Sequence, residues 1–148
     1  MRRGAVRAVA ATAVIAAMGL LGASGTGGAA ETITAFVGEA KIKVADVGRK
    51  GPSPGDDVLV RASLYADEAR SVRIGRVRAA CEQLDRNHLY CWNENTIDDR
   101  GEITSEGTQD LRSPLVLDPI TGGTGEFAGA LGTATVDFST GMVTFAIG

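Results

Sequence analysis

The sequence of 148 residues contains one histidine and two cysteines, and this scarcity excludes several kinds of catalytic site. His88 is the single histidine, and no sequence pattern pairs it as a base with a nucleophilic serine or cysteine. Ser53 lies in a G-x-S-x-G segment, Gly51–Gly55, but the prolines on both sides of it predict a loop and not the strand-to-helix turn of a nucleophilic serine. Neither an H-x-x-x-H segment nor a cluster of cysteine and histidine offers metal ligands. The sequence therefore predicts no metal site and no cofactor.

Helical periodicity is also scarce after residue 30. Short runs of Val, Ile, Thr and Phe alternate with clusters of Gly, Pro, Asp and Asn, which is typical of strands joined by turns. The expected strands are Thr32–Val47, Asp57–Tyr65, Val72–Cys81, His88–Ile97, Glu102–Gly107, Leu115–Ile120, Phe127–Phe138 and Met142–Ile147. The Arg49–Asp57 segment contains two prolines, which donate no hydrogen bond to a sheet, so we expect a loop there. The pattern predicts one all-β domain, either a sandwich or a barrel.

Residues 1–30 have the order of a secretory signal peptide. Three arginines precede the uncharged apolar run Val9–Leu21, and Gly28-Ala29-Ala30 supplies the small residues of a cleavage site. A retained membrane anchor is the alternative, but the run is short and rich in Ala and Gly for a membrane span. We expect a secreted, extracellular protein without a stable membrane span, whose single domain covers residues 31–148.

Acidic residues outnumber basic ones after this signal. The signal holds three of the 15 Lys and Arg residues and none of the 18 Asp and Glu residues, which leaves a formal charge of −6 for residues 31–148. Nucleic acids and anionic membrane surfaces attract basic proteins, so neither is an expected partner.

Glycines are concentrated in the segment Thr121–Gly132. Gly122-Gly123 and Gly125 suit a tight chain reversal, because glycine accepts positive φ without steric cost. We expect a strand, a glycine corner and a curved strand, an arrangement that lets a sheet close on itself. Gly123–Ala128 also fits the G-x-G-x-x-G/A form of a dinucleotide site, but the residues that follow are typical of a strand and not of the helix such a site needs.

The apolar residues around Gly75 change from even-numbered to odd-numbered positions. Val72 and Ile74 fall on one parity, whereas the apolar residues from Val77 onward fall on the other. A slip of one residue is what a β-bulge produces, so we predict a bulge centred on Gly75-Arg76.

Cys81 and Cys91 lie on neighbouring predicted strands, with nine residues between them. In an exported chain this arrangement favours a disulfide across a hairpin, although a reactive thiol is the alternative. Directly opposed residues in such a hairpin lie near the separation that a disulfide tolerates. If the cysteines face each other, the numbers of all opposed residues add up to 172.

That register places Arg78, Tyr90, Trp92 and Glu94 on one face of the hairpin. Turned outward, this face carries an ordinary exposed pair between Arg78 and Glu94. Turned inward, it would line a mostly apolar pocket with rings and one charge pair, suited to an amphipathic ligand. We take these four residues as candidate ligand-binding residues and assign no catalytic residue.

Several segments follow one another in an order and spacing that is found in a known superfamily. They cover most of residues 44–132 and are Asp46-Val47-Gly48, Lys50–Asp56, Leu64-Tyr65, Gly75-Arg76, Gly101–Thr104 with Gly107, and Ile120–Phe127. Together they resemble the allene oxide cyclase barrel-like superfamily, which includes the plant dirigent proteins, and above all its small secreted members from actinobacteria. The resemblance implies an eight-stranded antiparallel β-barrel with a central cavity, often in a trimer, and it adds Tyr65 to the candidate ligand-binding residues.

The resemblance also implies a function. Allene oxide cyclases and dirigent proteins hold a reactive intermediate and steer its ring closure or coupling, and some bacterial barrels of this type catalyse cycloadditions, all by shaping a greasy cavity without a cofactor. Dirigent proteins carry acidic residues before the segment that matches Leu64-Tyr65, whereas this chain has Arg61-Ala62-Ser63, which argues against acid chemistry of the dirigent type there. We expect a secreted barrel that binds a hydrophobic or amphipathic small molecule and steers its cyclisation or coupling, as a cofactor-free cyclase or isomerase. A binding or structural barrel without turnover is the alternative.

Overall fold

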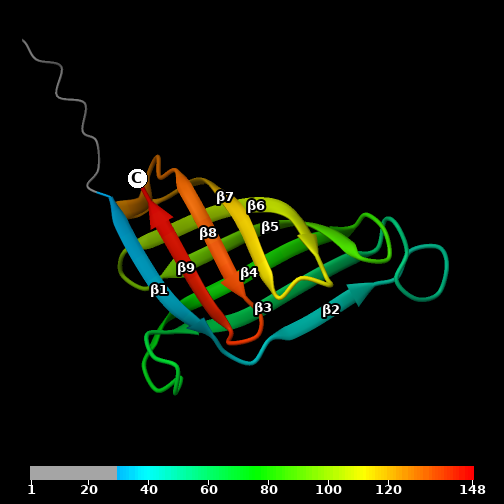
Figure 1. The fold of residues 1–148 in the computed structure, drawn as a ribbon, viewed down its shortest axis with the longest axis horizontal. Coiled ribbons are helices and arrows are strands. Elements are labelled where there is room, and N and C mark those ends of the chain that lie inside the picture. Colours follow the sequence, from blue (N-terminus) through cyan, green and yellow to red (C-terminus); the bar gives the residue numbers. More distant parts are fainter. Residues whose placement is uncertain (1–29) are drawn as a thin grey trace, which may run out of the picture.

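Alternation of apolar and polar residues produces nine antiparallel strands and one 3-10 turn in the computed structural model, which describes residues 30–148 (Figure 1). The strands are β1 (Glu31–Val37), β2 (Lys41–Ala45), β3 (Asp57–Tyr65), β4 (Arg73–Gln83), β5 (His88–Ile97), β6 (Gly101–Asp110), β7 (Leu115–Gly123), β8 (Gly132–Asp137) and β9 (Met142–Ile147). They follow the order β1-β9-β8-β7-β6-β5-β4-β3-β2, and β1 also pairs with β3. This last pairing closes the sheet.

The barrel closes because β1 and β2 pair with different parts of the same strand. Val37 of β1 lies opposite Leu64, whereas Lys41 of β2 lies opposite Arg61. The two short strands therefore share one place in the wall, and the prediction of a closed eight-stranded antiparallel barrel is confirmed. The single strand predicted over Thr32–Val47 is wrong in one respect, because the chain leaves the sheet between β1 and β2, and Figure 1 shows β2 diverging from the rest of the barrel.

The β4–β5 hairpin has the predicted register. Cys81 lies opposite Cys91, and a disulfide joins the two residues. On the other side of β4, Leu64 pairs with Gly75 and Tyr65 pairs with Arg73, so that Ile74 is the extra residue of a bulge. The predicted β-bulge is therefore present, one residue before Gly75-Arg76.

The glycine corner lies where the sequence predicts it. β7 ends at Gly123, and the 3-10 turn η1 (Gly125–Phe127) follows before β8 begins. Gly125 has a φ of +61°, and the carbonyl oxygen of Arg100 occupies the space that a side chain at Gly125 would need. The predicted start of the next strand at Phe127 is wrong, because the N–H of Phe127 donates to the Thr124 carbonyl at 3.1 Å and its ring is buried.

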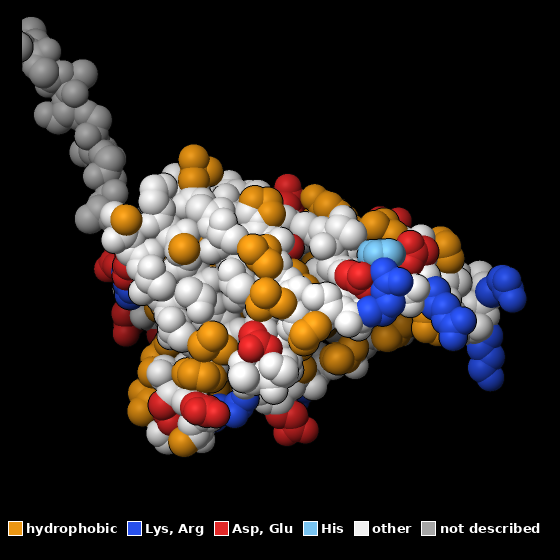
Figure 2. Space-filling model, in the orientation of Figure 1, with side chains coloured by type: hydrophobic (Ala, Val, Ile, Leu, Met, Phe, Trp, Pro, Cys, Tyr) orange, Lys and Arg blue, Asp and Glu red, His pale blue; other side chains and the backbone are white. Residues whose placement is uncertain are grey.

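Two apolar clusters fill the barrel. The larger one contains Phe145, Leu64, Ile103 and Phe127, and the smaller one contains Leu89 and the disulfide. Arg100 ties together the end of the barrel beside Phe127, through salt bridges to Glu31 at 2.8 Å and Glu126 at 2.7 Å. On the face seen in Figure 2, single apolar side chains are scattered, whereas Lys and Arg side chains gather at the end where β2 leads into its loop.

Candidate functional site

Four of the predicted ligand-binding residues lie together, but on the outer face of the barrel. Trp92 is 46% exposed, and the side chains of Arg78 and Glu94 are 56% and 55% exposed with 3.8 Å between their charged atoms. Tyr90 packs its ring edge-on against Trp92, with the ring centroids 4.9 Å apart. The opposite face of the hairpin carries the buried disulfide. Of the two directions that the sequence left open, the face with Arg78, Tyr90, Trp92 and Glu94 therefore points outward, and ligand binding by these residues stays a prediction.

Tyr65 lies apart from these four residues. It is the last residue of β3 and lies opposite Phe36 of β1 and Arg73 of β4. Tyr90 pairs with Glu82 at the other end of β4. The structure therefore does not bring Tyr65 into one site with the hairpin residues.

Small apolar side chains cover the inner face of β2, β3 and β4. Opposed residues on neighbouring strands place five of them on this face, and we call them the apolar wall: Ile42, Val44, Val58, Val60 and Ala79. Ile42 and Val44 are each 61% exposed, and the other three are half-buried, although all five share the face of the buried disulfide. The inner face of the barrel is therefore open to solvent along β2.

A cluster of polar side chains continues this wall toward β7. Asp118 of β7 is 2% exposed, and its Oδ2 accepts hydrogen bonds from Asn93 Nδ2 at 3.1 Å and Gln109 Nε2 at 3.4 Å. Asn93 lies directly opposite Ala79 of the apolar wall. Asn93 and Gln109 are half-buried, so they form the solvent-facing edge of this group, which we call the polar cluster.

The second carboxylate oxygen of Asp118 has no hydrogen-bond partner among the described residues. It occupies the space that a side chain at Gly107 would need, so the glycine makes room for the carboxyl. Burial raises the pKa of Asp118, and the hydrogen bonds from Gln109 and Asn93 oppose that increase only in part. A buried carboxylate with an unsatisfied oxygen is costly, so this site favours the neutral acid more than an exposed site would.

The polar cluster presents hydrogen-bonding groups in fixed orientations. Because Asn93 and Gln109 each donate an N–H to Asp118, their carbonyl oxygens are turned away from the carboxyl and remain available as acceptors. Such acceptors can orient a hydroxyl or amine of a molecule that lies on the apolar wall. Within residues 30–148, no three His, Cys, Asp or Glu side chains are grouped as metal ligands, and no helix is long and apolar enough to cross a membrane.

The sequence reasoning missed the polar cluster, although one signal pointed to it. Asp118 shares the parity of Val116 and Ile120 in a predicted strand, so an acid occupies a position where the pattern places apolar residues. Its partners lie 25 and 9 residues away along the chain, and only the folded barrel brings them together.

The chain is similar to several proteins of known structure. No family model and no curated protein matches the chain. A solved structure named pyocyanin demethylase is 25% identical, with a TM-score of 0.71 over 80% of this chain and 100% of that one. The pterocarpan synthase dirigent protein GePTS1 is 16% identical, with a TM-score of 0.62 over 80% of this chain and 85% of that one.

A third similar structure is the Diels-Alderase AbmU from Streptomyces koyangensis. It is 16% identical to this chain, with a TM-score of 0.57 over 80% of this chain and 61% of that one. The chain thus spans less than two thirds of AbmU. These likenesses confirm the resemblance that the sequence indicated: the chain has the barrel fold of the allene oxide cyclase and dirigent-like proteins.

Proposed function

We propose that the chain binds a hydrophobic or amphipathic small molecule on the inner face of its barrel and steers the cyclisation or coupling of that molecule without a cofactor. The observation that carries this proposal is the solvent-open apolar wall, which meets the polar cluster at Asn93. An apolar surface with a few fixed polar groups is the usual composition of a small-molecule site. The dirigent and Diels-Alderase barrels among the structural neighbours support a role in steering such reactions.

The proposed mechanism rests on orientation. The apolar wall holds the body of the ligand, and the carbonyl oxygens of Asn93 and Gln109 accept hydrogen bonds from its polar groups. Asp118 acts as a positioning residue, because its carboxyl fixes both amides. Ring closure or isomerisation makes and breaks bonds within one molecule, so a fixed conformation accelerates it without a co-reactant.

We also propose that the mature protein is secreted and assembles as a trimer. The signal pattern lies in residues 1–30, almost entirely outside the described residues, and the disulfide between Cys81 and Cys91 supports an oxidising compartment. The trimer rests on the resemblance to the superfamily alone.

The inner face is tested by two matched substitutions in β4. Ala79 points inward, whereas its neighbour Ala80 points outward. We expect Ala79→Phe to weaken binding of the neutral dye Nile red and of pyocyanin at least about tenfold, or ~1.4 kcal/mol, because the ring fills space beside the apolar wall. Ala80→Phe should bind as the natural protein does. Fluorescence titration with Nile red and equilibrium dialysis with pyocyanin give both affinities.

Controls for folding make the comparison of the two variants decisive. Circular dichroism and thermal melting must show that both variants fold. Equal loss of binding in both variants, or loss only in Ala80→Phe, would contradict the inner site.

Pyocyanin is included because one structural neighbour is a pyocyanin demethylase. Mass spectrometry of incubated pyocyanin distinguishes turnover from binding alone, and binding without any conversion of the molecules tested would favour the non-catalytic barrel.

A further inference from the structure

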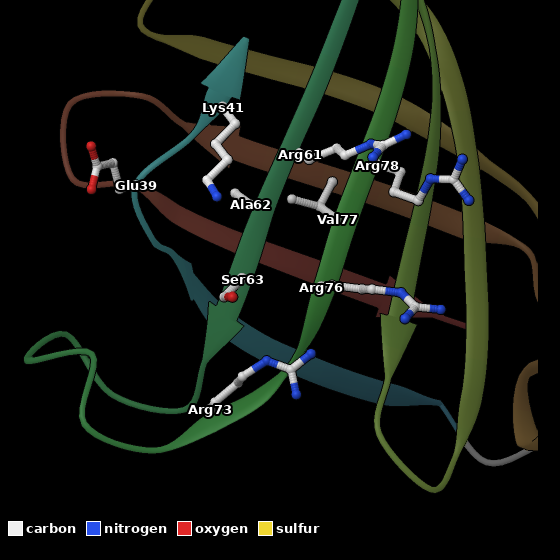
Figure 3. A pocket seen from close by; sticks show the side chains of 9 residues that line it. All are labelled: Glu39, Lys41, Arg61, Ala62, Ser63, Arg73, Arg76, Val77 and Arg78. Carbon is white, nitrogen blue, oxygen red and sulfur yellow. The ribbon is translucent and has the colours of Figure 1, made fainter.

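A hollow of about 630 Å³ lies on the outer face of β2, β3 and β4, opposite to the apolar wall (Figure 3). Five cationic side chains line it, and we call them the basic hollow: Lys41, Arg61, Arg73, Arg76 and Arg78. Glu39 is the one acidic residue of the lining. This concentration of cations contrasts with the excess of acidic residues in the described part of the chain.

The cations lie directly beside one another. Lys41 is opposite Arg61, and Arg61 is opposite Arg78, so three cations cross three neighbouring strands in one row. Strands in a sheet are about 4.8 Å apart, which places the backbones that carry these three charges within about 10 Å. Like charges directly opposite each other destabilise a sheet, so the row needs a counter-charge.

Side chains of the protein supply that counter-charge only in part. Arg73 forms a salt bridge of 2.9 Å with Asp98, and Arg78 approaches Glu94 at 3.8 Å. Among residues 30–148, Lys41, Arg61 and Arg76 form no salt bridge with any acidic side chain. Figure 3 shows the side chains of Arg61, Arg76 and Arg78 extending from adjacent strands around the hollow.

We propose that the basic hollow binds an anion that carries several closely spaced phosphate groups. Guanidinium groups match phosphate oxygens in paired hydrogen bonds, and the neighbouring arginines of the basic hollow can each contact a different phosphate. The hollow is open and its lining is mostly charged, which suits a hydrated polyanion better than an apolar molecule. A soluble oligophosphate and the head groups of a phospholipid surface both offer this chemistry. The site lies on the opposite face of the wall from the proposed small-molecule site and does not depend on it.

Isothermal titration with sodium tripolyphosphate tests the proposal. We compare the natural protein with Arg61→Gln/Arg76→Gln, which removes two cations of the basic hollow that form no salt bridge among the described residues. The control is Lys50→Gln/Arg86→Gln, which removes the same charge from exposed loops. We expect at least about a tenfold loss of affinity in the first variant and less than about a twofold loss in the control, and weaker binding as salt is raised.

A second readout guards against misfolding of the variant. Because Arg61 lies between two like charges, its replacement by Gln should leave the melting temperature of the protein unchanged or raise it. No binding of tripolyphosphate by the natural protein, or an equal loss in the control variant, would overturn the proposal.

Sedimentation with lipid vesicles separates the two sources of phosphate. Tripolyphosphate binding together with pelleting on phosphatidylglycerol vesicles, but not on phosphatidylcholine vesicles, supports a membrane source. Tripolyphosphate binding without pelleting supports a soluble anion. Pelleting without tripolyphosphate binding overturns the proposal.

Discussion

At the scale of single residues, Asp118 should give the barrel a stability that depends on pH. Burial raises its pKa, so the folded protein holds this proton more tightly than the unfolded chain does. The contribution of Asp118 to the free energy of unfolding is therefore greatest below the ordinary aspartate pKa. It falls as the pH rises from there through the raised pKa of the folded state.

Replacement by an amide removes this titration. We expect Asp118→Asn to gain stability relative to the natural protein as the pH rises from below the ordinary aspartate pKa to neutrality. Urea unfolding at several pH values measures the difference. A difference that does not vary with pH would show that Asp118 titrates alike in the folded and unfolded states.

Gly125 is the residue on which the glycine corner depends. Gly125→Val should lower the free energy of unfolding by about 1–3 kcal/mol, because the new side chain combines a φ of +61° with a clash against the Arg100 carbonyl. Gly129→Val is the matched control, since Gly129 has a φ of +77° but open space around it. Urea unfolding compares them, and an equal loss in both variants would mean that the contact with Arg100 is unimportant.

At the scale of elements, the disulfide holds the β4–β5 hairpin. Replacement of Cys81 and Cys91 by Ala should lower the free energy of unfolding by about 2–3 kcal/mol, because the unfolded hairpin loses its covalent constraint. Intact mass of protein from the culture medium provides the accompanying check. We expect a chain that begins near Glu31 and contains no alkylatable thiol. Retention of residues 1–30, or two free thiols, would contradict the secreted and oxidised state.

The strands themselves could be predicted closely from the sequence. Asp57–Tyr65, His88–Ile97 and Met142–Ile147 are strands with the predicted bounds, because alternating apolar residues there are limited by Gly, Pro, Asp or Asn. The pairing of the cysteines then determined the register of the whole hairpin. Local pattern and one covalent link were sufficient for this part of the fold.

The direction in which the hairpin faces could not be predicted in the same way. Both of its faces carry small and polar residues, with Ala80 on one and Ala79 and Asn93 on the other. Which face is buried depends on the closure of the barrel by β1 and β3, a contact between distant parts of the chain. The polar cluster depends on the same long-range contacts, so the sequence indicated only hairpin residues that the structure places on the outer face.

At the scale of the whole molecule, the division of the first predicted strand into β1 and β2 determines which part of the inner face is exposed. β2 extends the sheet beyond the closed wall and leaves the inner residues Ile42 and Val44 exposed. An apolar surface that remains exposed in this way usually marks a binding surface. The outer face of the same strands carries the basic hollow, so the two faces of one part of the wall offer opposite chemistry.

The central claim is that the ligand lies on the inner face of this wall, and methyl NMR tests it most directly. With methyl groups of Ala, Val and Leu labelled and Nile red bound, nuclear Overhauser effects should connect the dye to Val60 and Ala79. Leu59 and Ala80 alternate with them on the outer face, beside Trp92, and should show none. Contacts to Leu59 and Ala80 in the absence of contacts to Val60 and Ala79 would contradict the account and place the ligand outside the barrel.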